Sequence, residues 1–299
     1  MASILITGGT GLIGNHLCNL LLKKGHTVSI LSRTLSNKTN VYQWDIEHNY
    51  IDENAIKNCE YIIHLAGAGI ADKRWTSKRK KLLIDSRVSS ANLLFNKVQA
   101  LNPKLKGFIA ASGIGFYGAT TSEEIFNEKS SSGNDFLSEV CIKWEEASLK
   151  FTSLNIRTVI FRTGVVFTKK GGALEKITKP IKQGIGAALG KGTQYMPWIH
   201  INDLCNMYLK AIENTELNGI YNAVAPEHIT NTKLTQIIAK QLHKKVRLPN
   251  IPSFLLKLIF GKMAVILLEG SKVSSEKIKK TGFKFKFSNI KDALINLKP

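Results

Sequence analysis

Ile4-Leu5-Ile6-Thr7-Gly8-Gly9-Thr10-Gly11-Leu12-Ile13-Gly14 is the stretch that decides the fold of this chain. The Ile and Leu residues before the glycines predict a buried strand. After the glycines, Leu17, Leu20 and Leu21 recur at helical spacing. The stretch therefore predicts a strand, a tight turn and a helix in that order.

Three glycines in this stretch have the spacing G-x-x-G-x-x-G, which is typical of a dinucleotide site. Gly8 can turn the chain, Gly11 can let a pyrophosphate approach the backbone, and Gly14 can seat the helix against the strand. Leu12 and Ile13 open the helix, whose free N–H groups and positive dipole end favour a phosphate. We predict a dinucleotide site here; the alternative is a tight turn of some other α/β protein.

The end of the second predicted strand, 27–31, indicates which dinucleotide binds. Ser32 and Arg33 follow it, roughly twenty residues beyond the glycines, where an NAD site would place an Asp or Glu on the ribose hydroxyls. A hydroxyl and a guanidinium can instead bind a 2′-phosphate through charge-assisted hydrogen bonds of roughly 1.5–3 kcal/mol each. The sequence therefore predicts NADP rather than NAD, unless Arg33 is simply a solvated loop cation.

Composition limits the class of protein. The chain has 299 residues, 43% of them hydrophobic, and a formal net charge of +20. It suits one large α/β unit or two closely joined domains and excludes a disordered chain or a coiled coil. The charge permits contact with nucleic acid or an anionic membrane, but no aromatic-studded basic stripe is present. We interpret the lysines mainly as solvated faces and expect no nucleic-acid partner.

Several features bear on location and on metals. The first strand begins at the N-terminus and leaves no room for a signal peptide. The apolar stretch 251–268 is interrupted by Pro252 and Gly261, which favours short helices over a membrane span. The cysteines lie far apart and predict reduced core thiols rather than a zinc site or disulfides: Cys18, Cys59, Cys141 and Cys205. We expect a cytoplasmic protein with no metal and no membrane partner.

The fold class follows from alternating patterns. Further β-rich runs separated by helical patterns predict strands near residues 41–44, 61–64, 107–112 and 157–161. This alternation predicts a doubly wound parallel α/β sheet of the Rossmann type. We expect a dinucleotide-binding domain over 1–166, a smaller substrate-side region with shared sheet elements over 167–246, and a C-terminal extension over 247–299. In the extension, Lys284-Phe285-Lys286-Phe287 alternates like an edge strand.

Further motifs carry a family resemblance. They include His64-Leu65-Ala66-Gly67-Ala68-Gly69-Ile70, Ser86-Arg87-Val88, Gly115-Phe116-Tyr117-Gly118, Trp198-Ile199-His200-Ile201-Asn202-Asp203-Leu204 and Asn222-Ala223-Val224-Ala225-Pro226. Over essentially its whole length the chain resembles the extended short-chain dehydrogenase/reductases, and most closely an epimerase-like branch with a C-terminal extension of unknown function. The resemblance implies NADP contacts at Ser32, Arg33, Leu65, Ala66, Arg87 and Val166. Gly67, at a strand end, leaves room for the nucleotide.

The chain departs from the superfamily at its catalytic pair. Ordinary members use Tyr-x-x-x-Lys, in which the lysine lowers the tyrosine pKa so that the phenol can exchange a proton. No tyrosine of this chain has a lysine four residues later. Where the pair should lie, the chain has Phe136 with Val140, or Leu137 with Cys141 in the adjacent register. Another group must therefore supply the proton if hydride transfer occurs.

The same neighbourhood offers Ser112, Tyr117 and Glu139 as candidate acid-base groups. Ser112 ends a strand, Tyr117 lies on the following loop, and Glu139 shares a helical face with Asp135. Each has a structural alternative: a strand-end hydroxyl, an aromatic ring packed over the cofactor, a solvated carboxylate and, for Asp135, a helix N-cap. His64 lies inside an apolar strand, so we expect a core imidazole.

Downstream, residues 171–192 form a glycine-rich segment that we expect as a loop on the substrate side. His200 and Asp203 stand three residues apart at a predicted helix start, where we expect them to cap the helix and anchor the loop. Our leading hypothesis is an NADP-binding oxidoreductase or epimerase-like enzyme acting on an unidentified small polar metabolite. The alternative is a non-catalytic NADP-binding regulatory module. Assembly as a homodimer stays open.

Overall fold

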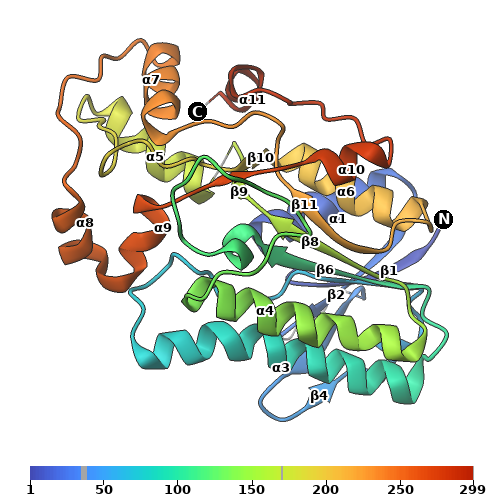
Figure 1. Cartoon of the computed structure of the whole chain (residues 1–299). Helices are drawn as coiled ribbons and strands as arrows, with labels where there is room; N and C mark the ends of the chain where they lie inside the picture. Colours follow the sequence, from blue (N-terminus) through green and yellow to red (C-terminus); the bar gives the residue numbers. More distant parts are fainter. Residues whose placement is uncertain (35–38, 170, 299) are drawn as a thin grey trace.

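The computed structural model describes residues 1–34, 39–169 and 171–298, and an eight-stranded sheet lies at its centre (Figure 1). In spatial order the strands are β11 (Gly219–Ala223), β8 (Thr158–Thr163), β6 (Gly107–Gly113), β5 (Tyr61–His64), β1 (Ser3–Thr7), β2 (Thr27–Ser32), β3 (Val41–Asp45) and β4 (Tyr50–Ile51). Neighbouring strands are parallel except β4, which runs antiparallel to β3. The predicted doubly wound parallel sheet is therefore confirmed.

Helices cover both faces of this sheet (Figure 1). One face carries α1 (Leu12–Lys23), α6 (Ile201–Glu213) and α10 (Glu276–Lys280). The other carries α2 (Glu53–Lys57), α3 (Ser77–Leu101), α4 (Phe136–Leu149) and the 3₁₀ helix η2 (Lys150–Leu154). Successive β1 side chains point to opposite faces: Ile4 and Ile6 pack with α1 and α6, whereas Leu5 packs with α2 and α3.

A smaller layer lies at the carboxyl ends of the strands. Its elements are β9 (Val165–Phe167), α5 (Gly172–Lys182), β10 (Trp198–His200), α7 (Asn231–Gln241) and α11 (Ile290–Leu297). β9 and β10 form a parallel pair, and a separate core joins this pair to the three helices. The chain returns to the large sheet at β11 between these elements, and a division at residues 166 and 246 stays a prediction.

The remaining elements are short helices and a two-stranded sheet. The 3₁₀ helix η1 (Ile114–Tyr117) follows β6, and β7 (Ile125–Phe126) pairs with β12 (Lys272–Val273). The late apolar stretch forms α8 (Ser253–Phe260), η3 (Gly261–Ala264) and α9 (Val265–Leu268). In the described part of the chain, no helix combines the length and the apolar character needed to cross a membrane.

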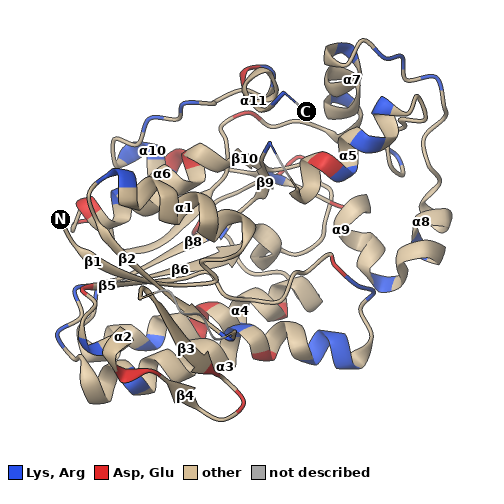
Figure 2. Ribbon diagram, turned by 180° about the vertical axis from the view of Figure 1, so that it is seen from behind, with Lys and Arg blue, Asp and Glu red and all other residues tan. Residues whose placement is uncertain are grey.

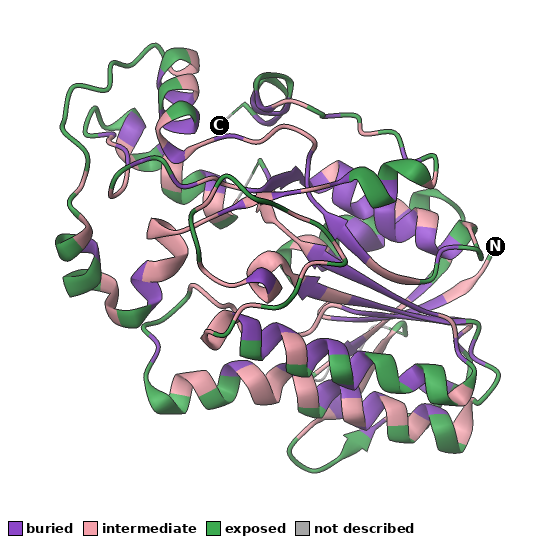
Figure 3. Ribbon diagram, viewed as in Figure 1, coloured by how far each residue is buried: buried purple, intermediate pink, exposed green. Residues whose placement is uncertain are grey.

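Figure 2 shows Lys and Arg on many helices rather than along one stripe. This agrees with our interpretation of most lysines as solvated side chains. Figure 3 shows the complementary pattern of burial, with the sheet and the inward faces of its helices buried. Every cysteine is buried and unpaired, as the spacing of the cysteines predicts.

Two local expectations are wrong. The segment 171–192 is not a loop throughout, because α5 occupies its first half. Lys284–Phe287 is not a strand: the N–H groups of Lys286 and Phe287 donate to the carboxylate of Asp203 instead of to a neighbouring strand. Phe287 stacks on the His200 ring, with centroids 3.8 Å apart. The alternation of Lys and Phe in residues 284–287 therefore reflects Phe side chains that pack beside α6, not an edge strand of a sheet.

Candidate functional site

The glycine turn brings the start of α1 against the end of β1. Gly8 has φ +70°, a conformation that favours glycine, and its carbonyl accepts a hydrogen bond from the Gly11 N–H at 3.0 Å. A Cβ at Gly14 would lie 2.2 Å from the Gly8 oxygen, so only glycine permits this approach. Gly11 caps α1 without a side-chain hydrogen bond, and the first turn, which begins with Leu12 and Ile13, carries no carboxylate. These features fit a bound pyrophosphate.

The neighbouring strand places Ser32 and Arg33 at the same edge of the sheet. β2 pairs in parallel with β1, so the two strands end side by side. Ser32 ends β2 and its hydroxyl accepts from the Thr34 N–H at 3.1 Å. Arg33 is exposed, and none of the ion pairs among the described residues involves it. A hydroxyl and a solvent-facing cation beside the glycine turn fit a 2′-phosphate.

His64 is a core residue, as its position in an apolar strand predicts. Its Nδ1 lies 2.7 Å from the Thr7 hydroxyl, and its Nε2 lies 3.2 Å from the Ser90 hydroxyl. The Thr7 oxygen already accepts from the N–H groups of Leu65 and Ala66, so its proton goes to Nδ1 and the imidazole proton lies on Nε2. Complete burial lowers the His64 pKa to about 4. The neutral ring thus holds the ends of β1 and β5 together.

Arg87 lies on α3, beside Gly67, which follows the end of β5. Its guanidinium donates to the Leu83 carbonyl at 2.9 Å and lies 4.8 Å from the centre of the Trp144 ring. A Cβ at Gly67 would lie 3.0 Å from the Arg87 Cζ, so the glycine lets the cation pack against the backbone. Burial lowers the Arg87 pKa from its usual value. Val166 lies half-buried in β9, beyond these groups.

A buried ion pair joins α4 to β8. Arg162 donates from Nε and from a terminal nitrogen to the two carboxylate oxygens of Glu145, each at 2.8 Å. Ser112 donates to the same carboxylate at 2.7 Å. The Glu145 and Arg162 side chains are 5% and 3% exposed. The predicted candidate Ser112 is therefore committed to a buried network that also holds a full negative and a full positive charge.

Tyr117 extends this network toward β11. Its hydroxyl accepts from Arg162 at 3.1 Å and donates to the Asn222 side-chain oxygen at 2.7 Å. The Arg162 guanidinium also lies 3.3 Å from the centre of the Phe116 ring. Burial raises the pKa of Tyr117, and the neighbouring guanidinium opposes that rise. Tyr117 is therefore a phenol that holds its proton, with a cation placed to stabilise the phenolate.

The third candidate, Glu139, does not belong to the network that contains Ser112 and Tyr117. Glu139 is exposed and pairs with Lys143 at 2.7 Å, one helical turn away on α4. It is a solvated carboxylate, which was its structural alternative, and no described contact links it to Ser112 or Tyr117. Asp135 is the N-cap of α4, as proposed, and accepts from the Ser138 N–H at 3.0 Å.

Reasoning from the sequence missed Glu145, Arg162 and Asn222. One signal for the pair was present: Arg162 ends an apolar strand, where a buried cation requires a carboxylate partner. The sequence spacing cannot identify that partner, because Glu145 reaches Arg162 only after α4 packs beside β6 and β8. Asn222 lies 105 residues from Tyr117 in the sequence.

His200 and Asp203 have structural roles. His200 is the N-cap of α6, and its Nδ1 accepts from the Asn202 N–H at 3.0 Å, as the sequence predicts. Asp203 instead anchors the distant segment that contains Lys286 and Phe287, with both N–H groups at 2.9 Å. The two side chains thus bind different partners and do not form a catalytic dyad.

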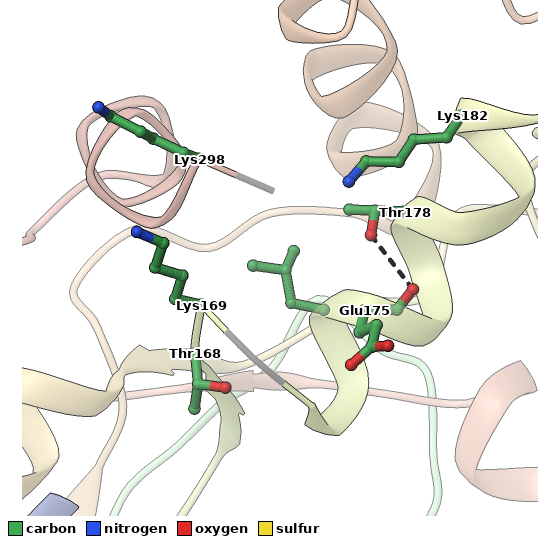
Figure 4. A pocket seen from close by; sticks show the side chains of 7 residues that line it. Thr168, Lys169, Glu175, Thr178, Lys182 and Lys298 are labelled. Atoms are coloured by element: carbon green, nitrogen blue, oxygen red, sulfur yellow. Dashed lines mark hydrogen bonds between the residues drawn. The ribbon is translucent and has the colours of Figure 1, made fainter.

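Two cavities open around the segment that follows β9. One, of about 770 Å³, lies beside the glycine turn and is lined by residues including Thr10, Gly11, Asn15 and Asn202. The other, of about 410 Å³, has Lys169 and Lys298 on one side and Lys182 on the other (Figure 4). Neither lining includes Ser112, Tyr117 or Glu145. Within the described residues, no group of three His, Cys, Asp or Glu side chains could hold a metal ion.

Comparison with known proteins finds one matching family and several similar chains. Residues 4–223 match the model of the NAD dependent epimerase/dehydratase family, and residues 251–297 match a domain of unknown function, DUF1731. An epimerase family protein of Staphylococcus aureus is 34% identical over 302 residues, with 99% of each chain covered. The Arabidopsis thaliana epimerase family protein SDR39U1 homolog, chloroplastic, is 33% identical over 98% of this chain and 85% of its own.

A solved structure is also similar over nearly the full length. The crystal structure of the human epimerase family protein SDR39U1 (isoform2) with NADPH has a TM-score of 0.90 and 31% sequence identity. The superposition covers 99% of this chain and 98% of the human one. Together with the family model over residues 4–223, this places the sheet, the glycine turn and the C-terminal extension in one known architecture. The chain therefore belongs to the NAD-dependent epimerase/dehydratase family.

Proposed function

We propose that the protein binds NADPH and acts as an atypical oxidoreductase or epimerase-like enzyme on a small polar metabolite. Gly8, Gly11 and Gly14 would hold the pyrophosphate with the start of α1, and Ser32 and Arg33 would hold the 2′-phosphate. The NADPH in the human relative supports this choice of cofactor. A cytoplasmic location and a homodimer stay predictions.

One observation carries the catalytic part of the proposal: the Tyr117 hydroxyl lies 3.1 Å from an Arg162 nitrogen. In the Tyr-x-x-x-Lys pair a lysine cation assists the phenol, and here Arg162 would take that part. Bound NADPH would supply a hydride to a carbonyl carbon. Tyr117 would donate its proton to the carbonyl oxygen, and Arg162 would stabilise the phenolate until water returns the proton.

The test is NADPH oxidation across a panel of small carbonyl metabolites. Wild-type protein should oxidise NADPH with at least one of them, and Tyr117→Phe should lower that rate by about 100- to 10,000-fold, the usual contribution of a general acid. NADPH affinity should not change. Tyr50→Phe is the matched control, because that ring is 47% exposed and lies on β4. A Tyr117→Phe protein that keeps the wild-type rate would overturn the assignment.

A non-catalytic NADPH-binding module is the second candidate, and a specific observation favours it. Tyr117 is only 4% exposed and its proton is already donated to Asn222. A phenol held in this way serves a structural purpose without any substrate. If the protein binds NADPH but oxidises it with no metabolite of a broad panel, the result would support the module over the enzyme.

A further inference from the structure

Exposed apolar side chains gather on α8 of the C-terminal extension. Phe254 and Leu258 are 73% and 72% exposed, and Ile259 and Leu255 are 52% and 38% exposed. Figure 3 shows this helix largely exposed at one edge of the molecule. Because apolar surface in contact with water is unfavourable, so many apolar groups on one short helix indicate a surface that another body covers.

The helix presents these residues while its other face is anchored. Leu256 is the buried residue of α8, and Phe260, one turn later, packs in the cluster formed by Trp75, Leu83 and Met263. Side chains four residues apart share one face of a helix, so Leu256 and Phe260 point inward together. The apolar surface is therefore held by the core of the protein and does not arise from a detached helix.

The sequence on both sides of α8 is rich in cations and lacks carboxylates. From residue 228 to residue 268 the chain contains no Asp or Glu, and its seven cations are Lys233, Lys240, Lys244, Lys245, Arg247, Lys257 and Lys262. Each is exposed, and none of them joins an ion pair among the described residues. The loop before α8 adds the exposed apolar residues Val246 and Leu248. We call residues 244–262 the α8 surface.

We propose that the α8 surface attaches the protein to an anionic membrane. A helix with apolar residues outward and Lys or Arg around them lies in the interface between lipid head groups and acyl chains. Eight residues of helix span only about 12 Å, far less than the roughly 30 Å of a bilayer core, so the helix would lie on the membrane. This proposal departs from the expectation of no membrane partner.

Charge favours this occupant over a second copy of the chain. Two copies meeting through the α8 surface would bring its five cations, Lys244, Lys245, Arg247, Lys257 and Lys262, against the same five, with no Asp or Glu within residues 244–262. Like charges at an interface oppose association, whereas anionic lipid attracts each Lys and Arg near its surface. Nucleic acid would satisfy the charges but would leave the Phe254 and Leu258 side chains in water.

The test is flotation of the full-length protein with vesicles. The protein should float with vesicles of phosphatidylcholine and phosphatidylglycerol, and far less with phosphatidylcholine alone. The double substitution Phe254→Ser and Leu258→Ser should weaken binding by about tenfold or more, since both apolar groups leave the interface. The control is Leu82→Ser with Ile295→Ser, which removes apolar groups 48% and 64% exposed on α3 and α11 and should bind like wild type.

Further measurements distinguish membrane binding from dimer formation. Lys244→Gln with Lys245→Gln should weaken binding to anionic vesicles, and higher salt should do the same. Unchanged thermal melting of the Phe254→Ser and Leu258→Ser protein would show that its fold is intact. Absent flotation with anionic vesicles, or flotation that this substitution leaves unchanged, would overturn the proposal. The surface would instead belong to a second copy if the wild-type protein formed a concentration-dependent dimer, did not bind vesicles, and lost the dimer on Phe254→Ser with Leu258→Ser.

Discussion

Glu145 and Arg162 form a bidentate ion pair, both bonds 2.8 Å long, between side chains that are almost fully buried. The pair connects α4 to β8 and also holds Ser112 and Tyr117 through their hydroxyl groups. A buried pair of this kind is costly to break, because the charge left behind has lost both its partner and its water. The residues that we assign to proton transfer are therefore held by the most buried ionic contact in the described chain.

Glu145→Gln should lower the free energy of unfolding by about 3–5 kcal/mol, because it leaves the Arg162 cation buried without a counter-charge. Glu139→Gln is the matched control on the same helix: its exposed pair with Lys143 should contribute less than about 1 kcal/mol. Urea unfolding of the two variants measures both values. Equal effects would show that the buried pair does not stabilise the fold.

Gly14→Ala should abolish NADPH binding and destabilise the protein. The added Cβ would lie 2.2 Å from the Gly8 oxygen and would push α1 away from β1. Gly25→Ala is the control, since its φ of +83° strains an alanine by about 1–2 kcal/mol while nothing lies within 4 Å of the added carbon. That variant should melt earlier yet bind NADPH normally in a fluorescence titration.

Features of the protein that depend on local spacing were predictable from the sequence. The glycine turn, the alternating strands and helices and the Asp135 N-cap each occupy a few consecutive residues, so the sequence records them directly. The Ser112–Glu145–Arg162–Tyr117 network is not recorded in this way, because its hydrogen-bonded pairs are 17 to 45 residues apart and meet only after the helices pack on the sheet. The prediction of a strand at Lys284–Phe287 failed for a related reason: the alternation of Lys and Phe comes from packing against α6, which is distant in the sequence.

Stability should fall as the pH drops from about 6.5 to about 4, partly through His64. The unfolded imidazole takes up a proton near pH 6.5, whereas burial keeps the native ring neutral to about pH 4. Protons therefore favour the unfolded chain in this window, by up to about 1.4 kcal/mol per pH unit for one group. His64→Gln should flatten the pH dependence of thermal melting, while the exposed His16→Gln should leave it unchanged. Identical slopes would contradict the assignment.

Asp203→Asn should loosen the C-terminal tail. The carboxylate accepts the N–H groups of Lys286 and Phe287, and an amide can replace only one of these two acceptors. A buried N–H left without a partner costs about 1–3 kcal/mol, so hydrogen exchange at residues 286 and 287 should accelerate. Asp292→Asn, in the first turn of α11, is the control and should not change that exchange. Unchanged exchange in the Asp203 variant would show that other contacts hold the tail.

The central claim is that the edge formed by the glycine turn, Ser32 and Arg33 binds NADPH. Calorimetric titration of NADPH and NADH into wild-type protein and Arg33→Asp tests it, with Arg74→Asp as an exposed control on another segment. Wild type and Arg74→Asp should prefer NADPH, and Arg33→Asp should lose about 10- to 100-fold of NADPH affinity with little change for NADH. Wild-type protein that does not bind NADPH, or an Arg33→Asp variant that binds it as tightly as wild type, would contradict the account.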